Sequence, residues 1–532
     1  MQKTAQVYPA NLAGIERIGS EYWHKTFSLP FHSEEYQLIY EAFQNAYTAA
    51  LPPEDLKDPL YQICVACYKI NMSLADYFFD SMMYIECGKQ GYTHLAMEKD
   101  ILVPDAVKQQ RNSIRFLVPE YKGFFFRFRE NWRKIRVNWG HHNIIDSLVP
   151  GDLSRHTTYL VGDRDCAEVT NYIKKTHINP LSLRPSLYLI ERFRTVQDQL
   201  LDDIREFCSS FFSNFKNFYG DTENLLDDFV QKKTLDYLLN SVRNYNSFNQ
   251  YLARRDIEGK GLLVNPIGNL LLRLFAAAWR SNGGKVTAFS HGNSYVECYP
   301  TDILNGSHLI ADTYVASSTG DKIVQEHEIA KNKGPFVSNA KIIAVSSSYH
   351  SLFEKLQSVP YTSEKIKKIL ISGYPMDYMH YFGWTTFNTL TMLHFEISVI
   401  KTLKRAGYYV IYKAHPESSS ETAKIIPDFS DEFLTEDFST TYKKADCLLY
   451  TYPGTTTFGF SLMTNIPIVV FCENIDKWHP ELLKLLKKRC RILSISLNKK
   501  SHVEFDTDAL IDAVNSAPAS INHEIIKEFA LK

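Results

Sequence analysis

The sequence lacks the segments that would place the chain in a membrane or in a secretory pathway. Its most apolar helical stretch, Leu270–Trp279, is interrupted by Arg273 and is far shorter than the ~20 residues that a membrane span needs. Met1–Ala10 contains no basic segment followed by an apolar run, so no signal peptide is expected. The nine cysteines are scattered and odd in number, which is typical of free thiols in an intracellular protein. We therefore expect a cytoplasmic protein.

Several motifs of nucleotide and metal enzymes are also absent. No G-x-G-x-x-G follows an expected strand, which disfavours a dinucleotide oxidoreductase, and Gly284-Lys285 lacks the other residues of a P-loop. Cys64 and Cys67 form a C-x-x-C pair with no second pair or nearby histidines, so we interpret them as buried thiols and expect no metal site. No organic cofactor is expected either. The net charge of -1 disfavours a nucleic-acid binder that relies on a global basic field.

What the sequence does contain is a repeated alternation of short β-rich runs and helical patterns. In the last third, strands are expected at Lys368–Ile371, Tyr408–Lys413, Cys447–Tyr450, Ile466–Phe471 and Arg491–Ile495. Helices are expected between them at Leu390–Arg405, Thr455–Met463 and Pro480–Lys488. Strands that alternate with helices form βαβ units and a parallel, doubly wound sheet, so the fold class is α/β.

A second, less regular set of βαβ patterns precedes this region. Strands are expected at Thr157–Val161, Gly261–Val264, Val286–Phe289 and Ile342–Val345, and helices at Leu189–Phe215, Leu225–Val242 and Leu270–Trp279. With 532 residues, two to three domains are expected. We divide the chain into a mainly helical N-terminal region (1–150), an N-terminal Rossmann-like lobe (151–360) and a C-terminal Rossmann-like lobe (361–532).

Two loops of the C-terminal lobe are candidates for holding a phosphate. Ligands of such sheets bind at the carboxyl ends of the strands. His415-Pro416 directly follows one expected strand, and the histidine ring N–H can bond a phosphate oxygen. Gly454 and the hydroxyls of Thr455, Thr456 and Thr457 follow another strand and lead into a helix N-terminus, which favours anions. One threonine is expected to be an ordinary N-cap.

The N-terminal lobe offers candidates for catalysis. His291, with Gly292, follows the strand Val286–Phe289, and a core histidine at a turn is an equally good interpretation. The other candidates are carboxylates that could act as base or nucleophile, where a helix-capping aspartate is the alternative for the first two: Asp163, Asp165, Glu297 and Asp312. The basic and aromatic segment Arg127–Arg136 is either a solvated strand or a docking site for a lipid-linked acceptor at the inner face of the cell membrane.

With these residues assembled, the chain resembles bacterial GT-B glycosyltransferases of capsule and lipopolysaccharide biosynthesis, and most closely those that use CMP-Kdo or CMP-sialic acid. His415-Pro416 and Thr455–Thr457 match in type and order the His-Pro and Ser/Thr motifs that contact the CMP phosphate in that group. Gly283–Val286 with His291-Gly292, followed by Ala311–Tyr314, is similar to a segment of β-Kdo transferases. Threonines replace the usual serines, and the acidic motif of the group has no clean match.

The resemblance implies a metal-independent transferase that moves Kdo or another nonulosonic acid from a CMP-sugar to a glycan or lipid-linked glycan. Its C-terminal lobe would hold the nucleotide and its N-terminal lobe the acceptor. A CDP-polyol phosphotransferase and a UDP-sugar transferase share the architecture and stay open as alternatives. A non-catalytic scaffold of a polysaccharide assembly complex is the alternative from another class.

Overall fold

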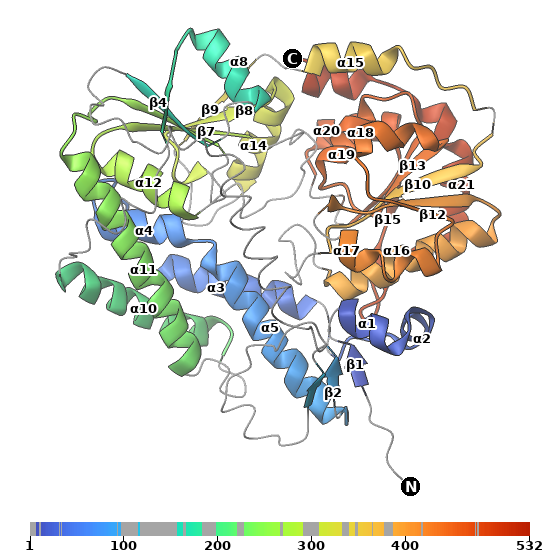
Figure 1. Cartoon of the computed structure of the whole chain (residues 1–532), viewed down its shortest axis with the longest axis horizontal. Helices are drawn as coiled ribbons and strands as arrows, with labels where there is room; N and C mark the ends of the chain where they lie inside the picture. Colours follow the sequence, from blue (N-terminus) through green and yellow to red (C-terminus); the bar gives the residue numbers. More distant parts are fainter. Residues whose placement is uncertain are drawn as a thin grey trace, which may run out of the picture.

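The computed structural model of the chain contains two α/β lobes and a layer of helices below the first of them (Figure 1). The structure describes residues 7–9, 12–30, 32, 34–92, 94–96, 115–117, 157–162, 166–183, 198–220, 228–265, 270–290, 308–331, 340–345, 349–363, 365–376, 387–416, 419–473, 475 and 478–532.

The C-terminal lobe is built on six parallel strands in the order β12-β11-β10-β13-β14-β15. They are β10 (Lys368–Ser372), β11 (Tyr409–Lys413), β12 (Glu432–Leu434), β13 (Cys447–Tyr450), β14 (Ile468–Cys472) and β15 (Arg491–Ser494). The helices that follow these strands are α16 (Thr389–Arg405), α17 (Ser419–Thr422), α18 (Phe438–Thr441), α19 (Thr456–Leu462), α20 (Pro480–Arg489) and α21 (Thr507–Ser516). Numbered within the lobe, the strand order is 3-2-1-4-5-6, which is the Rossmann order. The five predicted strands are confirmed, and β12 is an addition.

The N-terminal lobe carries a second sheet of six parallel strands, in the order β5-β4-β6-β7-β8-β9. They are β4 (Thr158–Gly162), β5 (Leu181–Leu183), β6 (Gly261–Asn265), β7 (Lys285–Phe289), β8 (Thr313–Ala316) and β9 (Lys341–Ala344). Its peripheral helices are α8 (Ala167–Thr176) and α14 (Thr319–Lys331), whereas the next helix, α15 (Tyr349–Gln357), packs on the hydrophobic core of the C-terminal lobe (Figure 1). Two doubly wound parallel sheets confirm the predicted fold class.

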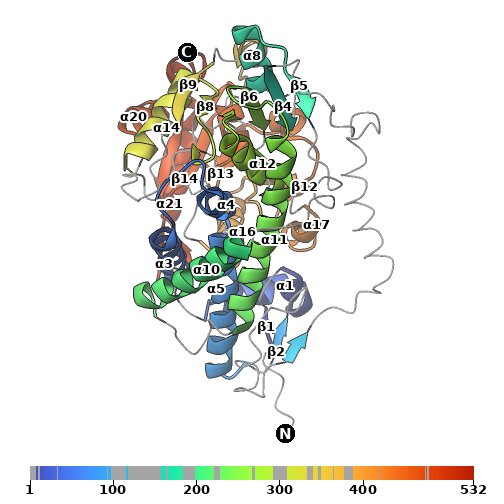
Figure 2. The same cartoon turned by 90° about the vertical axis from the view of Figure 1, so that its left-hand side faces the viewer.

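A helical layer extends the core of the N-terminal lobe (Figure 2). It consists of α3 (Glu34–Ala50), α4 (Pro59–Cys67), α5 (Ile70–Lys89), α10 (Asp198–Phe218), α11 (Asp228–Ala253) and α12 (Leu270–Ser281). α3 packs against α5 and α10, and Phe43 stacks on Phe215 with ring centroids 3.9 Å apart. Cys64 and Cys67 are free, fully buried thiols on α4, as expected. Among the described residues, no helix combines the length and apolar character needed to cross a bilayer.

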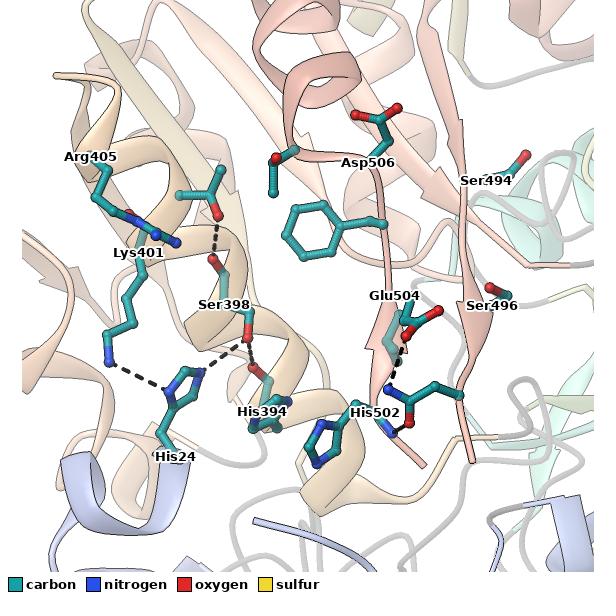
Figure 3. Close-up of a pocket in the computed structure, with 15 residues that line it drawn as sticks. His24, His394, Ser398, Lys401, Arg405, Ser494, Ser496, His502, Glu504 and Asp506 are labelled. Carbon is teal, nitrogen blue, oxygen red and sulfur yellow. Dashed lines mark hydrogen bonds between the residues drawn. The ribbon is translucent and has the colours of Figure 1, made fainter. Parts of the chain in front are cut away.

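The first two helices pack on the other lobe. α1 (Leu12–Ile18) and α2 (Ser20–Thr26) share the hydrophobic core that lies beneath α16. Figure 3 shows the contact, where His24 stacks on His394 at 4.5 Å and His394 stacks on His502 at 4.4 Å. These rings line a pocket of about 700 Å³ beside the hairpin of β16 (Ser496–Leu497) and β17 (Val503–Glu504). The N-terminal region is therefore divided between the cores of the two lobes.

The chain end returns to the N-terminal lobe. The π-helix η9 (Ile526–Ala530) packs on α14, and the Ser318 hydroxyl donates to the carbonyl of Phe529. The Thr319 hydroxyl donates to the carbonyl of Lys532 at 2.6 Å. Gly320 permits the contact, because a Cβ there would lie 2.2 Å from the Phe529 Cα. The last residues thus link the lobes at the carboxyl end of β8.

A small parallel sheet of β1 (Val7–Pro9), β2 (His94–Ala96) and β3 (Arg115–Leu117) completes the fold.

Candidate functional site

The strand order of the C-terminal lobe identifies where a ligand would bind. β10 and β13 are neighbours in the sheet, and the chain winds away from them in opposite directions, which makes this pair the topological switch point. Ser372, the last residue of β10, lies opposite Lys413 of β11 and Tyr450 of β13. The three strands therefore end at the same level. The loops that leave them carry His415 and the threonine segment, so two predicted phosphate loops lie at one sheet edge.

The threonine segment is bonded to the end of β10. Thr455 is the N-cap of α19, and its side-chain oxygen accepts the Thr457 backbone N–H at 3.3 Å. The Thr457 hydroxyl lies 3.0 Å from the Thr455 hydroxyl and 3.2 Å from that of Ser372. Thr456 is exposed at the first helical position. The expected N-cap is therefore Thr455, and a row of hydroxyls crosses the switch point. Because α19 has only seven residues, the hydroxyls matter more here than the helix dipole.

Hydrogen bonds within the loop hold the turn that precedes Thr455–Thr457. The Tyr452 hydroxyl donates to the carbonyl of Gly454, and the Thr455 N–H donates to the carbonyl of Pro453 at 2.8 Å. The Tyr450 hydroxyl, from the end of β13, donates to the carbonyl of Thr457 at 3.0 Å. Gly454 itself is buried. The backbone of this loop is thus held in one conformation before any ligand arrives, which reduces the entropy cost of binding.

The neighbouring loop begins with a buried lysine. Lys413 is 4% exposed at the end of β11, and its ammonium group donates to the carbonyl of Ala414. Burial lowers the pKa of Lys413, and the coulombic attraction of Asp437 and Glu436 opposes that effect. His415 follows, half-buried, and Pro416 is exposed. The loop that leaves β11, the strand next to β10, therefore carries a cationic group and an imidazole, a combination suited to an oxyanion.

Beneath these loops lies a fully buried carboxyl group that the sequence analysis missed. Glu396 of α16 accepts three hydrogen bonds: from the Tyr374 backbone N–H at 2.8 Å, from the Tyr412 hydroxyl at 2.6 Å and from the Thr451 hydroxyl at 2.7 Å. Burial raises the pKa of Glu396 to about 7, and the three hydrogen bonds partly oppose that rise. Gly373 leaves room for this arrangement, because a Cβ there would lie 2.3 Å from the Tyr412 hydroxyl oxygen.

Of the predicted catalytic residues of the N-terminal lobe, the structure describes only Asp312. His291, Glu297, Asp163 and Asp165 lie outside the described residues, as does the basic segment Arg127–Arg136. Asp312 is described and precedes β8 at its amino end.

Its carboxylate accepts the Val286 N–H at 2.7 Å and lies 3.8 Å from Arg280 and 4.0 Å from Lys285. Asp312 therefore binds the edge of the sheet opposite to the strand ends where ligands are expected, and we leave it out of the site.

The N-terminal lobe has its own switch point, between β4 and β6. Gly162 and Asn265 end these strands opposite each other. Gly162 has φ of +105°, and a Cβ there would lie 1.6 Å from the Asn265 carbonyl oxygen, so only glycine fits. Asn265 is 3% exposed, and within the described part of the chain its Oδ1 has no hydrogen-bond partner. A buried polar atom without a partner is rare and needs an explanation, for which a bound ligand is one candidate.

Metal ligation finds no support in the part of the chain that the structure describes, where no group of three or more His, Cys, Asp or Glu side chains is placed to hold an ion.

Comparison with known proteins leaves the family open. No family model matches the chain, and no curated protein matches its sequence. Among solved structures, similarity is found to the α,α-trehalose 6-phosphate synthase of Burkholderia multivorans. The identity is 12%, the TM-score is 0.32, and the match covers 66% of this chain and 79% of that one. The assignment of the fold therefore rests on the sheet topology described above.

Proposed function

We propose that the protein is a glycosyltransferase whose C-terminal lobe holds the nucleotide of a nucleotide-sugar donor. The observation that carries this proposal is the convergence at the switch point of that lobe. There, Ser372 and the Thr455–Thr457 segment are hydrogen-bonded to each other across β10 and β13, and the His415 loop leaves the adjacent strand β11. This is the location at which doubly wound sheets bind nucleotides.

The chemistry required of these loops is stabilisation of a leaving phosphate. In glycosyl transfer, the bond between the anomeric carbon and the phosphate oxygen breaks, and the acceptor oxygen forms a new bond to that carbon. Negative charge then develops on the phosphate. The His415 ring N–H, the Thr456 hydroxyl and nearby backbone N–H groups would hydrogen-bond this charge, with Lys413 adding a positive field. The acceptor hydroxyl proton would go to a carboxylate of the N-terminal lobe, for which Asp163, Asp165 and Glu297 remain the candidates.

For the donor we favour a CMP-activated sugar, Kdo or another nonulosonic acid, and for the acceptor a glycan. The donor choice rests on the His-Pro and threonine motifs at 415–416 and 455–457. The acceptor would bind at the switch point of the N-terminal lobe, where the unpartnered Oδ1 of Asn265 can accept a hydrogen bond from a sugar hydroxyl.

A thermal-shift screen against CMP, CDP, UDP, GDP and ADP tests the proposal. A ligand that binds only the folded state stabilises it by about 2.7 kcal/mol at a concentration 100 times its Kd. We expect CMP to give the largest shift and His415→Ala to abolish it. His32→Ala, which removes a histidine of the N-terminal region, should leave the shift intact.

Each other result has a defined meaning. A larger shift with CDP, and with CDP-glycerol or CDP-ribitol above CMP-sugars, would replace the transferase by a polyol phosphotransferase. Selective stabilisation by UDP or GDP would retain the glycosyltransferase and reject the CMP donor. No shift with any nucleotide would refute the donor site and leave a non-catalytic scaffold.

A further inference from the structure

Glu396 is the point where the three segments of the proposed donor site are tied together. Its three hydrogen-bond donors belong to three different strand ends: Tyr374 follows β10, Tyr412 lies in β11 just before the His415 loop, and Thr451 follows β13. These donors are 22, 16 and 55 residues away in the sequence. Fixing them to one side chain fixes the relative positions of the loops that follow.

The chemistry of the contact requires a carboxyl group. Oε1 accepts from both Tyr374 and Thr451, and Oε2 accepts from Tyr412. All three partners are hydrogen-bond donors, and a carboxylate supplies acceptor sites for all of them. Glutamine at 396 would offer a single acceptor oxygen and would add two N–H donors inside a fully buried site. A buried donor without an acceptor is costly, so glutamine keeps the shape of the site but not its bonding.

We propose that Glu396 is a positioning residue of the donor site, which holds the β10, β11 and β13 loops in the arrangement that binds the nucleotide phosphate without touching the nucleotide itself. This inference rests on the proposed function. The side chain is fully buried beneath the loops, so it acts through Tyr374, Tyr412 and Thr451.

The charge of Glu396 should make nucleotide affinity depend on pH. Glu396 faces the Tyr412 hydroxyl from β11, the Thr451 hydroxyl from β13 and the Tyr374 N–H from the β10 loop, and among these only Tyr412 is titratable. The raised pKa of Glu396 places its ionisation near neutral pH. An ionised carboxylate beneath the loops opposes a phosphate above them. Nucleotide affinity should therefore weaken more steeply in the wild type than in Glu396→Gln as the pH rises from 6 to 8, because His415 and the phosphate itself contribute the same pH dependence to both proteins.

The experiment combines amide hydrogen exchange with nucleotide titration on the full chain. In Glu396→Gln we expect faster exchange in residues 373–376, 414–416 and 451–457 together, with CMP binding weakened about tenfold and less dependent on pH than in the wild type. Thr451→Val, which removes one donor and keeps the side-chain shape, should loosen 451–457 alone. Arg405→Gln, an exposed position on the same helix, should change none of these.

The outcomes separate this inference from the function on which it rests. Unchanged exchange in the three loops of a folded Glu396→Gln protein would overturn the positioning role, even if the wild type binds CMP. The same holds for an unaltered pH profile of CMP binding. If the loops loosen together but the wild type binds no nucleotide at any pH, the donor-site function fails and the inference fails with it.

Discussion

Acidification should loosen the attachment of helix α2 to the C-terminal lobe, because stacked histidines form part of that attachment. The rings of His24, His394 and His502 follow one another at 4.5 and 4.4 Å, and the Lys401 ammonium lies 3.4 Å from the His24 Nδ1 (Figure 3). Burial and, to a smaller extent, the neighbouring histidines lower the pKa of His394 to about 3. Burial and Lys401 lower the pKa of His24 to about 4.

The sign and size of the effect follow from linkage. An exposed histidine has a pKa of about 6.5, so between pH 6.5 and pH 3 the open state binds a proton at His394 that the closed state excludes. Stability is therefore lost as the pH falls below 6.5. pH 5 lies about 1.5 units below the pKa of an exposed histidine, so His394 lowers the stability of the closed state there by about 2 kcal/mol. His24 is partly exposed, so solvent screening makes its contribution smaller.

Hydrogen exchange of residues 20–26 at pH 7 and pH 5 measures this opening directly. His394→Phe is the informative variant, because phenylalanine keeps an aromatic ring between His24 and His502 but cannot be protonated. After correction for intrinsic exchange, we expect the wild type to lose about 2 kcal/mol more opening free energy than His394→Phe over this interval. Equal losses in the two proteins would show that His394 is not held neutral and would refute the reasoning.

Three further substitutions test one contact between the lobes and two contacts within the C-terminal lobe. Gly320→Ala places a Cβ 2.2 Å from the backbone of η9, so the chain end should detach and become sensitive to carboxypeptidase, whereas an intact chain end would contradict the observed packing. Thr455→Ala should cost about 1 kcal/mol in denaturant unfolding because it removes an N-cap, and Thr455→Ser should restore most of it. Arg489→Met leaves buried carbonyls without the guanidinium that bonds them, so a loss of about 3 kcal/mol is expected in the same assay.

Long elements with a regular pattern were predictable from the sequence, and short ones were not. Five of the six strands of the C-terminal sheet appear where their apolar runs predicted them, whereas β12 of that sheet and β5 of the other are only three residues long, too short for a period to show. The predicted end of α11 at Val242 was wrong, since the helix continues to Ala253. Tyr245, Phe248 and Leu252 carry its buried stripe onward between polar residues, and that spacing was available in the sequence.

Some residues of the candidate site have a local signal in the sequence, and others do not. His415 and Thr455–Thr457 could be proposed from the sequence because each loop directly follows a strand, and parallel strands end at a common edge. Asp312 became a candidate because it is a carboxylate that follows His291 in the sequence, and only the fold shows that it lies at the amino end of β8. Glu396 has no local signal, since it is one acidic residue within the helical pattern of α16.

The importance of Glu396 arises only when three distant segments fold onto it. A search for acidic residues near motifs would have passed over it, because its nearest hydrogen-bonding partner is 16 residues away. What marks it is the combination of full burial with three donors, a combination that costs free energy unless the geometry is fixed. Buried carboxyl groups of this kind are therefore best identified from the loops. The search starts from the backbone N–H and hydroxyl groups of the loops and asks which buried side chain accepts hydrogen bonds from several of them.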